Sequence, residues 1–142
     1  MAIPVINEVP KYSTVIPSSK VKVKFRPFLV KEQKVLLMAL ESQNEEDMLE
    51  SIVDTIESCY DNVEARNLTT FDIEYLFTKL RSKSVGESTE IGVHCTYCEK
   101  VTQIEIVLDN IEIEEVKPAP DIALNDKFIL KLKYPSYSKV RE

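Results

Sequence analysis

The spacing of apolar residues changes near Gly86, and this change constrains the fold more than any other feature of the chain. Before Gly86, apolar residues recur every three or four positions, which is the period of an amphipathic helix. From Thr89 onward they alternate with polar residues, which is the period of a half-buried strand. The sequence therefore predicts an α+β fold in which an N-terminal β-hairpin and a three-helix core are followed by a small C-terminal antiparallel sheet.

An N-terminal β-hairpin is expected before the helices. The stretch YSTVIPSSKVKVKF combines a short strand at residues 13–16, a Pro-Ser-Ser turn and an alternation of lysine and valine over residues 20–25. The alternation places Val21, Val23 and Phe25 on one face and the lysines on the other.

Three helices are expected between Pro27 and Gly86. The dense apolar pattern of RPFLVKEQKVLLMALES predicts a first helix that is largely buried. Asn44 is the expected N-cap of the second helix, and Thr69 is that of the third, with Asp72 as the acidic residue of its capping box.

Apolar stripes on the second and third helices predict the hydrophobic core. Cys59 lies on the stripe of the second helix, so we interpret it as a core residue rather than a reactive thiol. Nearly full burial is expected of Ile52, Ile56, Ile73, Leu76, Phe77 and Leu80. Alternation over residues 101–108 and 126–134 predicts strands, and no further core segment is expected after YPSYSKVRE.

The length of 142 residues is sufficient for one domain with a hydrophobic core. We expect a single domain over residues 1–142, with the hairpin and helical part at 10–86 and the antiparallel β part at 87–137. The formal net charge of −6 argues against a nucleic-acid partner, because phosphate binding requires a basic surface.

Several other classes are disfavoured by composition. No apolar run is long enough to cross a bilayer and the N-terminus lacks a signal-peptide pattern, so no membrane is expected and the chain should stay in the cytoplasm where it is made. Two glycines cannot form a phosphate-binding loop. The single histidine, His94, is adjacent to Cys95 on a predicted strand, where the two side chains point to opposite faces.

The stretch GVHCTYCEKV places Cys95 and Cys98 at a spacing typical of a zinc knuckle. Two thiolates supply only half of a tetrahedral site, so His94 or Cys59 would have to complete it within the chain, or a partner or second copy from outside. The residues favour a third interpretation, in which reduced cysteines close a hairpin without metal. No cofactor is therefore expected, and zinc stays open as an alternative.

Charge is segregated along the chain. Residues 20–34 hold six basic residues against Glu32, whereas residues 41–57 hold seven acids and residues 105–115 hold five, without a basic residue in either range. These runs are either solvated faces or opposed patches that orient the protein in an assembly.

Long segments of the chain carry a family resemblance over residues 10–137: KVKFRPFLVKEQKVLLMALES, FDIEYLFTKLRSKSVGE and the terminal YPSY, in that order. On these segments the chain resembles the baseplate hub subunit family of T-even-like contractile-tailed bacteriophages. The resemblance implies a structural or assembly role without catalysis, with other phage tail or baseplate hub proteins as partners. It also implies assembly in the host cytoplasm and a place in the virion tail baseplate. Family members continue beyond the Tyr-Pro motif, which indicates a short member or a fragment.

Two hypotheses follow for the mode of action. In the first, the chain acts by surface complementarity, and Arg26, Phe28 and Lys31 at the start of the first helix contact another tail protein, since a basic cluster adjoins excess apolar surface there. In the second, Cys95 and Cys98 form a zinc-dependent protein-binding module. Self-association is compatible with both hypotheses.

Overall fold

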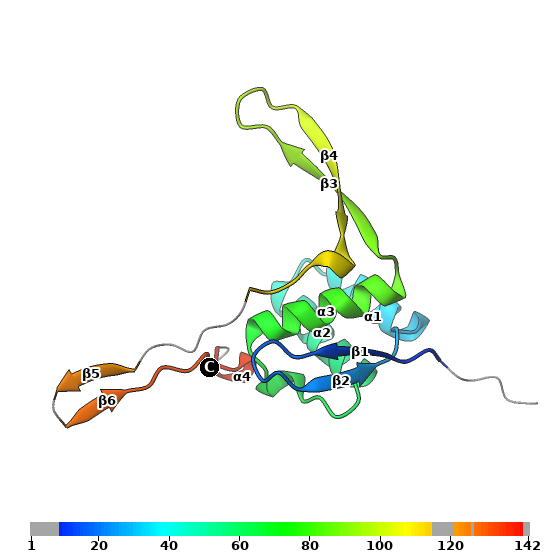
Figure 1. The fold of residues 1–142 in the computed structure, drawn as a ribbon. Helices are drawn as coiled ribbons and strands as arrows, with labels where there is room; N and C mark the ends of the chain where they lie inside the picture. The colour runs from blue at the N-terminus through cyan, green and yellow to red at the C-terminus, as the bar shows by residue number, and fades with distance from the viewer. Residues whose placement is uncertain (1–8, 115–120, 126, 141–142) are drawn as a thin grey trace, which may run out of the picture.

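The structure is a computed structural model that describes residues 9–114, 121–125 and 127–140. A body of helices carries an N-terminal hairpin on one side, and two further hairpins project from it (Figure 1). The elements, in chain order, are β1 Tyr12–Val15, β2 Lys22–Phe25, α1 Val30–Glu41, α2 Glu45–Cys59, η1 Ala65–Asn67, α3 Thr70–Ser84, β3 Ser88–His94, β4 Val101–Val107, η2 Leu108–Asn110, β5 Ile122–Asn125, β6 Phe128–Leu130 and α4 Tyr137–Val140. The expected α+β class, with hairpin, three helices and C-terminal antiparallel strands, is confirmed.

The N-terminal hairpin pairs β1 with β2 and covers the helical core. Val23 and Phe25 are buried, whereas Val21 lies before β2 and stays exposed. The ring of Phe25 stacks on Tyr60 at the end of α2, with 4.9 Å between centroids. The turn of this hairpin is fixed to α3, because the backbone amide of Ser18 donates to the buried carboxylate of Asp72 at 3.0 Å. The hairpin is therefore fixed to both α2 and α3.

The core lies where α2 and α3 meet the hairpin. The buried apolar residues of these elements include Val23, Phe25, Val53, Ile56, Cys59, Tyr60, Ile73, Leu76 and Leu80. The expected burial of Cys59 and four of the six predicted core residues is confirmed, but Ile52 and Phe77 are only partly buried. Both pack at the margin of the cluster, because the apolar stripes are wider than the contact between the helices.

Both predicted helix caps are present. The side chain of Asn44 accepts a hydrogen bond from the amide of Glu46 at 3.1 Å, and this bond begins α2. At the start of α3, Thr69 and Asp72 form a capping box, with 2.6 Å between Oγ1 of Thr69 and the Asp72 carboxylate. The carboxylate of Asp72 thus serves the helix cap and the hairpin turn together.

The β part, expected over residues 87–137 as one small antiparallel sheet, consists of separate hairpins in the described residues. In the described residues, β3 pairs only with β4 and β5 only with β6, both antiparallel. Alternation defines strands and their faces, but each strand here pairs with its neighbour through a short turn and acquires no third strand. The strand expected over residues 126–134 is also shorter than predicted, because β6 ends at Leu130. Most of the Pro-rich connection between the hairpins lies outside the described residues.

Asp109 fixes the base of the β3–β4 hairpin to α3. Its carboxylate accepts hydrogen bonds from Ser82 and Lys83, and its backbone carbonyl accepts one from Lys79 at 2.8 Å. The hydrogen bonds from Lys83 and Ser82 hold the pKa of Asp109 below its ordinary value. The hairpin above this anchor extends away from the helices (Figure 1).

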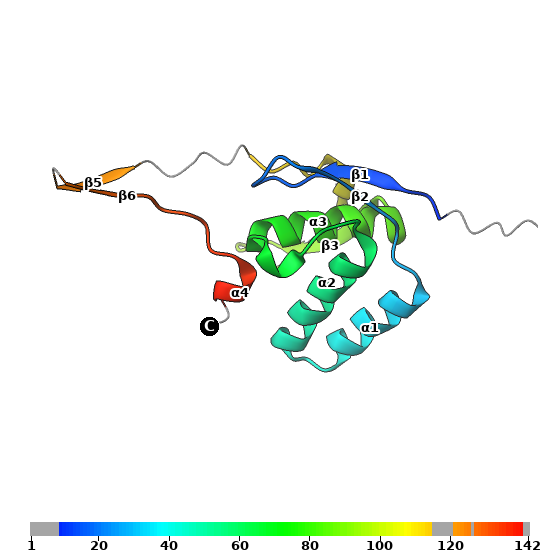
Figure 2. The ribbon, with the colours of Figure 1, turned by 90° about the horizontal axis from the view of Figure 1, so that it is seen from below.

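The C-terminal segment returns to the helical body, which sequence analysis did not anticipate. The amide of Tyr137 donates to the carbonyl of Leu68 at 2.8 Å, and its side chain packs against the core. Ser136 forms an isolated bridge with Thr69. The YPSY motif therefore closes the structure over the start of α3 (Figure 2).

Candidate protein-contact surface

The start of α1 is built around Glu32. Its carboxylate accepts a hydrogen bond from the amide of Leu29 at 2.8 Å and an ion pair from Arg26 at 2.9 Å. Burial alone would raise the pKa of Glu32, but the hydrogen bonds from Arg26 and Leu29 outweigh it and hold that pKa below its ordinary value. This carboxylate therefore caps the helix and binds the preceding loop.

Arg26 links the same loop to α2. Its guanidinium donates to Glu32 and to the carbonyl of Ser58, the latter at 3.2 Å, and its backbone amide donates to the carbonyl of Cys59 at 3.1 Å. The hydrogen bond to Glu32 is the main reason that the pKa of Arg26 is raised. The amide of Phe28, two residues on, donates to Oγ of Ser84 at 3.1 Å. Both residues thus position α1 on the body.

Replacing Arg26 with alanine is expected to lower the free energy of unfolding by about 2 kcal/mol, because it leaves the buried Glu32 without its main cation. Lys31 is the matched control, since it approaches the same oxygen of Glu32 at 3.4 Å. The Arg26 side chain is 22% exposed and that of Lys31 73%, so Lys31→Ala should cost less than about 0.5 kcal/mol. Urea denaturation measures both, and equal small losses would refute this role of Arg26.

The apolar side chains of α1 are the main unexpected feature of the body. The helix was expected to be largely buried, but only Glu32 and Ala39 are. Relative exposures of 43% to 81% are found for Leu29, Val30, Val35, Leu37, Met38 and Leu40. At 3.6 residues per turn these positions are distributed around the helix, whereas only one side packs against α2 (Figure 2). A helix that is apolar all round is normally covered on all sides.

A shallow groove of about 400 Å³ lies between this helix and α2. It is lined by Val35, Met38 and Ala39 of α1, by Ser42 at its C-cap, and by Asp47, Glu50, Ser51 and Asp54 of α2. One wall is thus mainly apolar and the other mainly acidic. Arg66 of η1 pairs with Glu50, Asp54 and Glu57, and the hydrogen bonds that its guanidinium donates to Asp54 and Glu50 raise its pKa.

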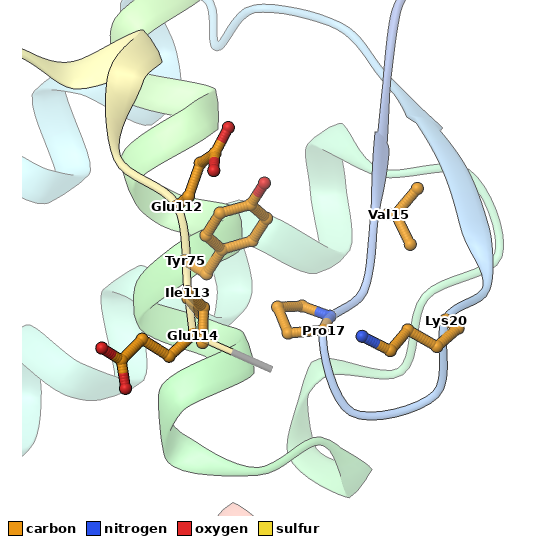
Figure 3. Close-up of a pocket in the computed structure, with 7 residues that line it drawn as sticks. All are labelled: Val15, Pro17, Lys20, Tyr75, Glu112, Ile113 and Glu114. Atoms are coloured by element: carbon orange, nitrogen blue, oxygen red, sulfur yellow. The ribbon is translucent and has the colours of Figure 1, made fainter. Parts of the chain in front are cut away.

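Two other surface hollows do not gather reactive groups. One, of about 280 Å³, lies between the β1–β2 turn, Tyr75 and residues 112–114. Figure 3 shows the ammonium group of Lys20 on one side of it and the carboxylates of Glu112 and Glu114 on the other, without convergence. The second, of about 500 Å³, lies beside Lys83 and Asp109, which already pair with each other. Neither resembles a catalytic site.

The predicted thiol pair is exposed at the tip of the β3–β4 hairpin. Cys59 differs from this exposed pair, because it is buried in the core and burial raises its pKa to about 11. His94 ends β3 opposite Val101. Among the residues that the structure describes, no group of three or more His, Cys, Asp or Glu side chains is placed to hold a metal ion. A third ligand from His94 or Cys59 is therefore not brought to the pair.

These observations define a class: a small α+β protein with projecting hairpins and an uncovered apolar helix, suited to contacts with other proteins. The family model described as T4 bacteriophage base plate protein matches residues 9–142, so the chain belongs to that family and is a structural component of a phage baseplate. Searches of curated proteins and of solved structures each returned no significant match. No helix in the described residues has the length and apolar character required to cross a bilayer.

Proposed function

We propose that the chain is a subunit of the baseplate hub that acts through protein–protein contacts and performs no catalysis. The observation that supports this proposal is the exposure of several large apolar side chains on α1, because apolar side chains that gather uncovered on one element mark an interaction site. Membership in a base plate family supplies the setting. Assembly takes place in the host cytoplasm, and the product is the tail baseplate.

The proposed occupant of this surface is an amphipathic segment of another baseplate protein. Its apolar side would cover Val35, Met38 and their exposed neighbours on α1. Its basic side would face Asp47 on the α2 side of the groove, where Glu50 and Asp54 already pair with Arg66, since interfaces pair complementary charge around an apolar centre. This arrangement favours a partner with a basic edge.

The residues proposed for the contact from sequence take separate roles in this proposal. Lys31 is exposed and forms part of the surface itself. Arg26 and Phe28 support α1 from the side of the body, because the Arg26 guanidinium donates to the carbonyl of Ser58 and the Phe28 side chain packs against the core. Replacing either side chain would disturb the contact by moving α1 and not by deleting a contact atom.

The projecting hairpins support a role in assembly. In β5–β6, Leu124, Phe128 and Ile129 are each 64% exposed, and the hairpin stands away from the helical body (Figure 1). An isolated two-stranded hairpin is marginally stable in water, so a surface that orders it is needed. A neighbouring baseplate subunit would provide that surface.

Co-purification tests the proposal. The chain carries an affinity tag in cells infected by the phage that encodes it, and captured proteins are identified by mass spectrometry. We expect other baseplate proteins of that phage in stoichiometric amounts. Capture of the chain without any other baseplate protein, whether as a monomer or as a dimer, would contradict the proposal.

A further inference from the structure

We propose that one Zn²⁺ joins two copies of this chain through Cys95 and Cys98 of each, at the tips of their β3–β4 hairpins. The site would be a tetrahedral four-cysteine centre on a two-fold axis. This inference concerns a different part of the molecule from the α1 surface and does not depend on the proposed function.

The turn between β3 and β4 is shaped around Cys95. Its amide donates to the carbonyl of Lys100 at 2.9 Å, and its carbonyl accepts from the amide of Glu99 at 3.0 Å. Glu99 has a φ of 56°, the left-handed conformation that lets a tight turn close behind Cys98. The backbone of the turn is therefore folded back on itself with both cysteines on it.

Thr96 and Tyr97 separate the two cysteines, and this is the spacing at which two thiolates of one turn can bind the same zinc ion. Both cysteines are exposed, so the pair is accessible to a metal ion from solvent.

The pair is half of a zinc site, and no third ligand joins it among the described residues. A second copy supplies an identical pair, and two-fold symmetry then gives four equivalent sulfur ligands without any other protein. The same residues in a one-chain site would leave two coordination positions to water, which is unlike closed structural zinc sites.

The shape of the molecule permits the approach. Strands of seven residues at about 3.4 Å per residue carry the tip roughly 20 Å along the hairpin. Figure 1 shows this hairpin standing clear of the helical body, so two tips can meet while the bodies stay apart. Tyr97, between the two cysteines, is almost fully exposed and would be covered in the pair.

The test uses the full chain, purified in reductant without chelator. Elemental analysis should give half a zinc per chain, and light scattering should give a dimer. Cys95→Ser and Cys98→Ser should each bring zinc to background and yield monomers, with helical circular dichroism unchanged because the core lies elsewhere. His94→Ala, the neighbouring control, should keep zinc and dimer. Cobalt substituted for zinc should show the absorption of a tetrahedral tetrathiolate centre.

Several outcomes would overturn the inference. They are absence of zinc, one zinc per monomer, zinc retained after either serine substitution, zinc lost in His94→Ala, or a Cys95–Cys98 disulfide found by mass spectrometry after thiol alkylation.

Discussion

Replacing Leu76 with alanine is expected to lower the free energy of unfolding by about 3–5 kcal/mol, because it opens a cavity in the centre of the core. Leu76 is fully buried on α3 and belongs to the same core cluster as Val53 and Ile56. Its carbonyl also accepts the hydroxyl of the buried Tyr60 at 2.8 Å, so a collapse of the backbone into the cavity would strain that bond. Urea or thermal denaturation measures the loss.

Leu37→Ala is the matched control for this prediction. It removes the same atoms from a leucine that is 52% exposed on α1, so the cost should stay below about 1 kcal/mol. Phe77→Ala should fall between the two, because Phe77 packs at the margin of the core. Equal losses for Leu76 and Leu37 would show that the core is not centred on α2 and α3.

The parts of the fold that depend on local sequence could be predicted. Asn44, Thr69 and Asp72 are caps whose chemistry acts within three residues, and each lies where its pattern indicated. The stripes of α2 and α3 likewise identified Ile56, Ile73 and Leu76, because both helices face one shared core.

The first helix could not be predicted in the same way. Its apolar residues indicate that it must be covered, but periodicity does not say whether the cover comes from the same chain. In this chain the apolar side chains of α1 stay largely exposed, so the pattern that predicted burial is consistent with a surface that another protein covers. The excess of apolar surface near Phe28 was visible in the sequence, although Phe28 itself packs inward.

Contacts between segments far apart in the sequence also could not be predicted from sequence patterns. Alternation identified β3 and β4 but could not exclude a third strand. The ion pair between Arg26 and Glu32 could not be predicted either, because an Arg beside a Phe also has the composition of an interface, and the contact of Arg26 with a partner stays a prediction. The docking of Tyr137 on Leu68 had a weak signal in the Tyr-Pro-Ser-Tyr motif, whose paired aromatic residues suit a surface contact.

Charged residues on α1 should block assembly without unfolding the protein. The variant Leu37→Lys/Met38→Lys places two ammonium groups in the proposed apolar contact, where each would be desolvated without a partner. A loss of about 3 kcal/mol in contact energy corresponds to roughly 100-fold in affinity. The unfolding free energy should change by less than about 1 kcal/mol, since both side chains are more than half exposed.

The matched control is Val21→Lys/Val85→Lys. It adds the same charge at two apolar residues of similar exposure, 52% and 63%, against 52% and 60% for Leu37 and Met38. Neither lies on α1 or lines the groove beside it. A loss of function confined to the α1 variant would therefore come from that surface and not from charge or exposure.

The most direct measurement is complementation of a phage that lacks this gene, with infectious progeny counted and tails imaged by electron microscopy. The wild-type chain and the Val21→Lys/Val85→Lys control should restore progeny to similar numbers. The Leu37→Lys/Met38→Lys variant, folded and present at the same level, should give about 100-fold fewer infectious particles and tails without complete baseplates. Normal progeny and complete baseplates with the α1 variant would contradict the account that this helix joins the chain to the baseplate.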